Sequence, residues 1–215
     1  ACDKYGIMVW QDFWLANPWD GPNPFYEGMF MQNAYDMVRR IRNHPSIAFY
    51  CGRNEGNPPA SLDAALRKLV GEQHPGMYYF PHSANDVVSG NGPYRALEVS
   101  EYFKAERGRN RLHSERGMPN VMTAENFRRT MREDAWWPQS SRWGIHDFCL
   151  ENAQGCETFN AMVANGFREP QNLDEFAQWG QWINYNGYRA MFESRSWERK
   201  GIILWMTHSC WPSMV

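Results

Sequence analysis

The sequence lacks the motifs that mark several common classes of protein. Its five cysteines are an odd number and form no C-x-x-C pair, which argues against a disulfide framework or a zinc ribbon. Its six histidines form no H-x-H or H-E-x-x-H motif, so no metal site is predicted. No apolar run approaches the roughly 18 residues that a membrane helix needs, and no membrane span is expected.

Charge and composition exclude further classes. The chain of 215 residues carries 22 Lys plus Arg against 24 Asp plus Glu, a formal net charge of −2, so the positive surface of a nucleic-acid-binding protein is not expected. Hydrophobic residues make up 43% of the chain, which argues against disorder. Residues 1–6 read like the interior of a longer chain and show no signal peptide, so the cellular compartment stays open.

Aromatic residues, by contrast, are abundant. The chain contains 12 Phe, 11 Trp and 10 Tyr. Wide, partly polar rings at this density suit a hydrophobic core, and they also suit a cleft that stacks on sugar rings.

Short apolar runs alternate with amphipathic segments, the pattern of β-α units around a parallel sheet, and this predicts an α/β fold. Strands are expected over 7–10, 47–51, 77–80, 110–115 and 201–206, with a further short strand around 97–103. The run 201–206 is apolar enough to predict a buried strand. Helices are expected over 29–42 and about 62–71, from Thr123 onward, and from 172 through 191. Thr123 is the expected cap of its helix, and Asn172 with Glu175 reads as a capping box.

The polar residues that follow the strands are the candidates for chemistry, because active sites of parallel α/β proteins lie beyond the carboxyl ends of the strands. Glu55 follows the run 47–51, and Glu115 ends the run 110–115. Two carboxylates at the ends of separate strands are what retaining glycoside hydrolysis requires. On spacing alone, two such glutamates are usually solvated surface groups, and a structural role in a plain α/β domain also stays open.

Local sequence around both glutamates resembles one enzyme family. Arg-Asn-His-Pro-Ser-Ile at 42–47, followed by Gly-Arg-Asn-Glu at 52–55, resembles the signature of glycoside hydrolase family 2, within the clan of (β/α)8-barrel retaining glycosidases. The resemblance implies that Glu55 is the general acid/base and that Asn54 binds the sugar's 2-substituent. His-Ser-Glu-Arg-Gly-Met-Pro at 113–119 resembles the nucleophile segment, which makes Glu115 the nucleophile.

Two further motifs extend the resemblance along the whole chain. Residues 5–13 resemble the third barrel strand of the β-mannosidase branch, and 203–206 with 210–214 resemble the eighth strand of exo-β-glucosaminidases. The resemblance therefore implies a (β/α)8 TIM barrel, present here as a partial barrel of about strands 3 to 8. Residues 1–215 would form one catalytic segment, and the N-terminal strands and flanking β-sandwich domains of the parent protein would lie outside the chain.

The function implied by the resemblance is an exo-acting retaining β-glycosidase that hydrolyses terminal β-mannosides or β-glucosaminides. An endo-β-mannosidase or a β-galactosidase of the same family stays open, as does a carbohydrate-binding barrel that has lost turnover. The implied partners are a glycan substrate and the remaining domains of the parent protein, which in this family is often exported. The chemistry requires no cofactor.

Most of the other candidate site residues carry two interpretations. Asp12 could bind a sugar hydroxyl or amino group, or be a loop carboxylate. Trp205 is the candidate platform under the −1 sugar. Trp10 and Trp211 could wall the cleft or belong to the core. His113 could contact sugar hydroxyls or be structural.

Two arginines depart from the family's usual pattern. Arg53 and Arg116 stand beside the candidate catalytic carboxylates, where the family more often has small or aromatic residues. Each arginine could lower the pKa of its neighbouring carboxylate or pair with an anionic substrate group. Alternatively, each could point away from the site and bind a neighbouring helix.

Overall fold

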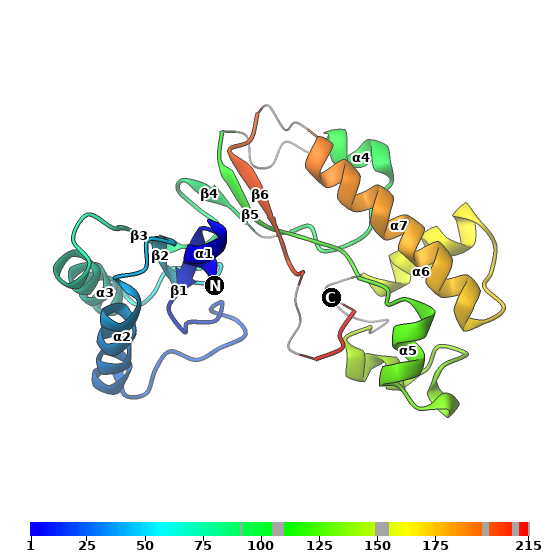
Figure 1. Ribbon diagram of the computed structural model, residues 1–215, viewed down its shortest axis with the longest axis horizontal. Helices are drawn as coiled ribbons and strands as arrows, with labels where there is room; N and C mark the ends of the chain where they lie inside the picture. Colours follow the sequence, from blue (N-terminus) through cyan, green and yellow to red (C-terminus); the bar gives the residue numbers. More distant parts are fainter. Residues whose placement is uncertain (91, 105–109, 149–154, 195–197, 208–210, 215) are drawn as a thin grey trace. The chain divides into compact units, whose positions relative to one another are not determined.

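A computed structural model of the chain describes residues 1–90, 92–104, 110–148, 155–194, 198–207 and 211–214, and it has an α/β fold with parallel strands (Figure 1). The chain divides into two compact units, Ala1–Gly90 and Asn91–Val215. Each unit contains its own cluster of buried hydrophobic residues. No helix among the described residues is both long and apolar enough to cross a membrane.

The first unit is built on a parallel sheet of three strands. These are β1 (Val9–Asp12), β2 (Ile47–Arg53) and β3 (Tyr78–His82), with β2 in the middle. The predicted strands over 47–51 and 77–80 are confirmed. The first strand starts two residues later than predicted, and the side chains of Ile7 and Met8 before it are exposed.

Two helices of the first unit lie side by side next to this sheet. They are α2 (Glu27–Ile41) and α3 (Ala60–Gln73), as the apolar spacing predicts (Figure 1). Their apolar faces supply much of the unit's core through Ala34, Val38, Leu62, Leu66, Leu69 and Val70. The unit also contains a short helix α1 (Cys2–Tyr5) and the two-residue strand β4 (Val88–Ser89).

The second unit contains β5 (Leu112–Arg116), which pairs in parallel with β6 (Gly201–Leu204). The strand expected over 110–115 therefore begins two residues later than predicted. The prediction of a buried strand over 201–206 is wrong in two respects. The strand ends at Leu204, and its residues are only partly buried, with Ile203 42% exposed. Apolar composition alone does not distinguish a strand covered on both faces from one covered on a single face.

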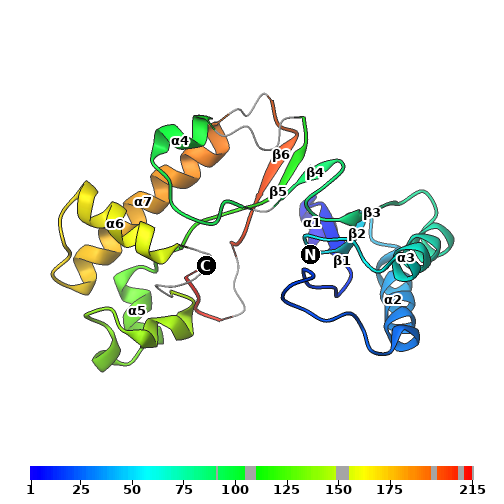
Figure 2. The same ribbon diagram turned by 180° about the vertical axis from the view of Figure 1, so that it is seen from behind.

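The helices of the second unit gather around one long helix. This helix is α7 (Leu173–Glu193), and α4 (Val99–Lys104), α5 (Ala124–Thr130) and α6 (Cys156–Gly166) pack along it (Figure 2). Two 3₁₀ helices, η1 (Glu133–Ala135) and η2 (Ser141–His146), follow α5. The residue pattern alone does not predict α6 or the 3₁₀ helices.

The strand predicted around 97–103 is wrong, because this segment forms α4. Tyr102 is buried, whereas Val99 and Phe103, four residues apart, are both exposed. The Tyr102 hydroxyl accepts a hydrogen bond from the Leu97 amide at 3.1 Å, which holds the start of the segment against the buried ring. Packing of one aromatic residue therefore decides the conformation of a segment whose pattern is ambiguous.

The predicted helix caps are mostly confirmed. The Thr123 hydroxyl accepts a hydrogen bond from the Asn126 amide at 3.3 Å, and Asn172 Oδ1 accepts one from the Glu175 amide at 2.9 Å. The Glu175 carboxylate, however, accepts from the Gln171 amide at 2.9 Å rather than completing the capping box at Asn172. Only the first half of the capping box is formed, because the Glu175 carboxylate accepts a hydrogen bond from the backbone of Gln171 instead of Asn172.

An aromatic cluster forms the centre of the second unit's core. The Trp143 ring lies 4.7 Å from Phe127 and 5.4 Å from Phe176, measured between ring centroids, and all three are buried. Three other tryptophans pack partly buried against this core: Trp136, Trp137 and Trp179. Trp182 differs from them, because it is 56% exposed.

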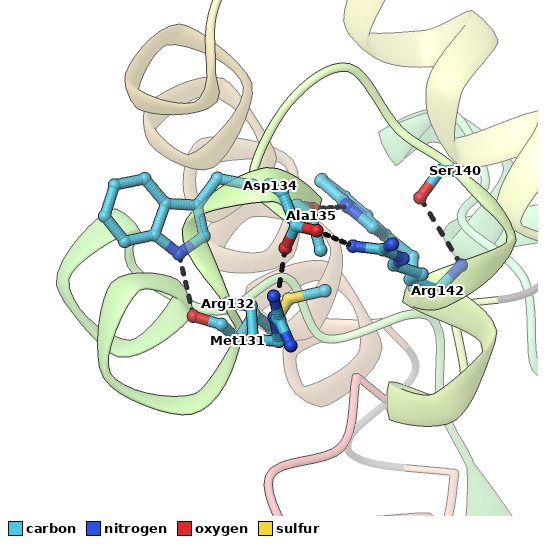
Figure 3. A network of polar contacts seen from close by, with 8 residues as sticks. Met131, Arg132, Asp134, Ala135, Ser140 and Arg142 are labelled. Carbon is cyan, nitrogen blue, oxygen red and sulfur yellow. Dashed lines mark hydrogen bonds and ion pairs between the residues drawn. The ribbon is translucent and has the colours of Figure 1, made fainter.

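The segment after α5 is tied together by a polar network (Figure 3). The Asp134 carboxylate lies 2.6 Å from the Arg142 guanidinium and 3.3 Å from that of Arg132. The hydrogen bond from Arg142 lowers the pKa of Asp134, so this carboxylate stays ionised. Trp143 Nε1 donates to the Ala135 carbonyl at 2.9 Å and fixes η2 against η1. The exposed ion pairs add little to the stability of this segment, and burial of the Trp143 ring contributes most of its stability.

A buried asparagine of α7 holds the segment that follows β5. Asn184 is 7% exposed. Its side-chain amide donates to the Pro119 carbonyl at 2.6 Å, and its Oδ1 accepts from the Val121 amide at 3.0 Å. Because both backbone groups would otherwise be buried without a partner, Asn184 fixes the path of the chain just after Glu115.

We therefore predict that Asn184→Ala lowers the free energy of unfolding by about 3 kcal/mol, because it leaves two buried backbone groups unsatisfied. Urea denaturation of the full chain measures this loss. Gln178→Ala, at an exposed position of the same helix, is the control and changes the free energy by less than about 0.5 kcal/mol. Equal unfolding midpoints for the two variants would contradict this role of Asn184.

Candidate active site

In the first unit, the residues after β2 and β3 meet at the carboxyl edge of the sheet. Ser83 lies at the centre of this group. Its hydroxyl donates to Asn54 Oδ1 at 3.0 Å and accepts from the Glu55 amide at 2.8 Å. The Ser83 amide also donates to the Arg53 carbonyl at 3.1 Å. One serine therefore positions both the asparagine and the glutamate that the sequence singled out.

Glu55 adopts an unusual backbone conformation. Its φ is 45°, in the left-handed region that few residues other than glycine occupy. Such strain persists only where surrounding contacts fix it, and it is frequent at functional sites. The Glu55 charge also reaches His82, where it opposes the effect of burial, which is the larger effect and lowers the pKa of His82.

Asp12 lies at the carboxyl end of β1, opposite Cys51 of β2. The Trp10 indole donates a hydrogen bond to Asp12 Oδ1 at 2.7 Å. Although the residue keeps exposed surface, atoms packed around its carboxyl desolvate it and raise its pKa, and the Trp10 hydrogen bond opposes this. The Trp10 ring itself contacts Phe49 and Phe80 edge-on, so it is partly packed into the sheet.

Arg53 neither faces a helix nor points to solvent. It is 4% exposed, and its guanidinium holds the loop between β1 and α2. Nε donates to the Ala16 carbonyl at 2.7 Å, and the terminal nitrogens donate to Asn23 Oδ1 at 2.8 Å and the Gly21 carbonyl at 3.3 Å. Arg53 therefore fixes a long loop beside the end of β2, which neither interpretation from the sequence anticipated.

In the second unit, Glu115 lies near the carboxyl end of β5 and is half-buried. The Tyr94 hydroxyl donates to Glu115 Oε2 at 2.5 Å. The Tyr94 ring contacts the Trp205 ring at 5.0 Å between centroids, at an angle of 66°. Carboxylate, phenol and indole therefore form one cluster at the ends of β5 and β6, with the carboxylate oriented by a charge-assisted hydrogen bond.

Close backbone approach holds this cluster together. The Trp205 amide donates to the Arg116 carbonyl at 3.0 Å, and the Gly117 amide donates to the Pro93 carbonyl at 3.2 Å. A Cβ atom on Gly117 would lie 1.8 Å from the Trp205 carbonyl oxygen. Only glycine fits at this position, because the chain after β5 comes so close to the residue that follows β6.

Arg116 and His113 both point into the protein. Arg116 is 3% exposed, and its guanidinium lies 4.8 Å from the ring centroid of Tyr102 in α4, consistent with an arginine that binds a neighbouring helix. His113 is fully buried, and its Nε2 hydrogen-bonds the Gly92 carbonyl at 3.0 Å. This placement favours a structural role, and substrate contact by His113 stays an untested prediction.

The remaining candidate is Trp211, which is 51% exposed. Among the described residues, no group of three or more His, Cys, Asp or Glu side chains is placed to hold a metal ion. His208, another histidine near a strand end, lies outside the described residues. The sequence interpretation missed Ser83 and Tyr94, although both are polar residues that come soon after strands, which is the signal that selected Glu55.

Comparison with known proteins finds glycosidases among the proteins that this chain resembles. No family model matches the sequence. The chain is 27% identical to a mannosylglycoprotein endo-β-mannosidase of Lilium longiflorum over 273 residues, and 26% identical to β-mannosidase B of Aspergillus fumigatus over 265 residues. The two matches cover 99% and 100% of the chain. Over its whole length the chain is therefore similar to β-mannosidases.

The chain spans only 28% and 30% of the length of these two relatives. Solved structures show the same fold. A β-D-mannosidase from Dictyoglomus thermophilum matches with a TM-score of 0.81 at 24% identity, and an exo-chitosanase from Amycolatopsis orientalis matches with 0.78 at 16%. Each match covers 99% of this chain and 29% of the other.

The burial of His113 generates a testable prediction. Burial lowers the pKa of His113 to about 4, from 6.5 for a free histidine. Between these pH values the unfolded chain therefore binds more protons than the folded chain. The contribution of His113 to the free energy of unfolding is complete above pH 6.5, and up to about 3 kcal/mol of it is lost as the pH falls toward 4. NMR titration of the ring is expected to show a midpoint near 4, and urea unfolding of His113→Gln a weaker dependence on pH in this range. A midpoint near 6.5 would refute the assignment.

Proposed function

We propose that the chain is a catalytic segment of a retaining β-glycosidase that acts on β-mannosides. The observation that carries the proposal is the half-buried Glu115 carboxylate, held by Tyr94 beside the Trp205 ring, in a chain related to β-mannosidases along its whole length. A carboxylate oriented by a phenol and flanked by an aromatic platform suits attack on the anomeric carbon of a sugar ring.

We propose that residues 1–215 form part of one (β/α)8 barrel, from about strand 3 to strand 8. The six strands that the structure describes would be these strands in order, β1 to β6. The pairs β1–β2, β2–β3 and β5–β6 are parallel, as neighbouring strands in such a barrel must be. The structural matches, which cover 99% of the chain, support this assignment. The remaining strands and any flanking β-sandwich domains would come from the parent protein.

The proposed mechanism is a double displacement. Glu115 attacks the anomeric carbon while Glu55 donates its proton to the departing glycosidic oxygen, so that a glycosyl–enzyme ester forms and the alcohol leaves. Glu55, now a carboxylate, then removes a proton from water, and this water cleaves the ester and restores Glu115. The mechanism requires the two carboxyl groups to lie roughly 5–5.5 Å apart across one sugar. It requires no metal or cofactor.

The residues around the carboxylates have supporting roles in this proposal. Asn54, oriented by Ser83, hydrogen-bonds the 2-hydroxyl of the sugar, where contacts strengthen in the transition state. Asp12, whose pKa is raised by burial, binds a further hydroxyl with Trp10 behind it. Trp205 lies under the −1 sugar, and Trp211 contributes an exposed ring to the wall of the cleft.

β-Mannosides are the proposed substrates because both relatives compared by sequence are named for mannosidase activity. A terminal β-glucosaminide is the second choice, and the fold shared with an exo-chitosanase does not decide between the two sugars. A panel of nitrophenyl β-glycosides on the complete protein separates the sugars. A mannosylated glycopeptide separates exo from endo action, since only an endo enzyme releases an intact oligosaccharide from it.

Mutation of Glu115 gives a direct test. Glu115→Gln removes the nucleophile and is expected to lower kcat/KM for nitrophenyl β-mannoside by about 10⁴-fold. Glu115→Gly leaves space for a small anion, so azide is expected to restore turnover and give an α-mannosyl azide, with inverted configuration.

The matched control is Glu125→Gln, which alters an exposed glutamate in the first turn of α5 and is expected to leave kcat/KM unchanged. Near-normal turnover by Glu115→Gln, or a β-azide product from Glu115→Gly, would show that Glu115 is not the nucleophile.

A further inference from the structure

A pocket of about 440 Å³ lies beside α7, and none of the residues proposed for catalysis lines it. It is bounded by α7, by the residues just before α4 and by the C-terminal end of α6. Leu97, Met162 and Ile183 supply apolar lining. The volume falls within the range of pockets that bind small ligands, roughly 300–1,000 Å³.

Two aromatic rings border this pocket with part of their surface open. Trp182 is 56% exposed, and its ring stacks on Tyr185 at 5.7 Å between centroids and 26°. Phe167 is 42% exposed and stacks on Trp179 at 5.1 Å and 3°. Each bordering ring is therefore held in place by a neighbouring ring, which lowers the entropy lost when a ligand packs against it.

Polar groups of the same pocket have hydrogen-bonding capacity to spare. Asn165, Asn186 and Glu98 all line it. Among the residues that the structure describes, none of these three side chains makes a hydrogen bond or an ion pair. The two amides can each donate and accept, and the carboxylate accepts, so the group matches a ligand rich in hydroxyl groups.

The charge of the pocket limits its ligands further. Its described lining contains no lysine or arginine, and Glu98 gives it a negative charge. Phosphates, sulfates, uronic acids and nucleic acids would meet repulsion and no cationic partner. An uncharged ligand with one apolar face and several hydroxyls fits both the aromatic border and the amides.

We propose that this pocket is a second carbohydrate-binding site, which takes an uncharged pyranose unit of an oligosaccharide. The apolar face of the ring packs on Trp182, and the hydroxyls hydrogen-bond Asn165, Asn186 and Glu98. Such a site holds a glycan chain on the enzyme independently of cleavage. It shares no residue with the proposed catalytic groups, and its test needs no turnover, so it stands or falls separately from the proposed function.

Affinity gel electrophoresis of the complete protein tests this site. Native gels contain soluble galactomannan, hydroxyethylcellulose or glycol chitin, all of which are uncharged polymers of different pyranoses. The wild type is expected to be retarded by at least one of them. Trp182→Ala is expected to weaken that affinity by roughly tenfold or more, because it removes the stacking face. Asn186→Ala tests the polar half of the site and is expected to weaken the same affinity.

The matched control is Phe192→Ala, which removes an aromatic side chain that is 49% exposed on the same helix and does not line the pocket. It is expected to be retarded like the wild type, and circular dichroism checks that all variants are folded. The proposal is overturned if no polymer retards the wild type, or if folded Trp182→Ala is retarded as strongly as Phe192→Ala. It is equally overturned if gel filtration shows that Trp182 instead holds two copies of the protein together.

Discussion

Parallel hydrogen bonding between β1, β2 and β3 brings the carboxyl ends of three strands to one edge of a sheet, and the chemistry of the first unit depends on this register. Asp12 lies opposite Cys51, and Arg53 lies opposite His82. Had any pair been antiparallel, its polar ends would point in opposite directions. Because the strands run the same way, Ser83 after β3 reaches Asn54 after β2. The Ser83 hydroxyl also binds the amide of Glu55, the candidate acid/base, and helps to hold its left-handed backbone conformation.

Buried polar side chains then fix the loops that such a sheet cannot fix itself. Arg53 binds the loop after β1, and Asn184 binds the chain after β5. On burial, each of these groups loses its hydrogen bonds to water, and hydrogen bonds within the protein replace them. Loss of one partner leaves the other buried and unsatisfied, so these positions tolerate substitution poorly although neither of them is a large apolar residue.

Much of the fold could be predicted from the sequence, because long elements carry regular patterns. The helices α2, α3 and α7 have apolar stripes, and Thr123 and Asn172 cap their helices as expected. The segment of α4 could not be predicted, since one buried ring decides its conformation. The degree of burial of β6 depends on what covers each face of the strand, which the residues of the strand do not encode.

The candidate site was partly predictable for the same reason. Glu55, Asn54 and Glu115 follow apolar runs directly and carry local motifs. Tyr94 and Ser83 also come soon after strands, but their roles depend on contacts with residues 21 and 28 positions away, which that local signal does not reveal. The loop-holding role of Arg53 is likewise a long-range contact, which explains why neither interpretation from the sequence was right.

The role of Glu115 as nucleophile is the central claim, and trapping the intermediate tests it most directly. The complete protein is incubated with 2-deoxy-2-fluoro-β-mannosyl fluoride. Its 2-fluorine slows both formation and hydrolysis of the ester, while its good fluoride leaving group keeps formation fast enough for the ester to accumulate. Peptide mass spectrometry is expected to find one fluoromannosyl group, attached to Glu115. The absence of any adduct, or an adduct on another carboxylate, would contradict the proposed function.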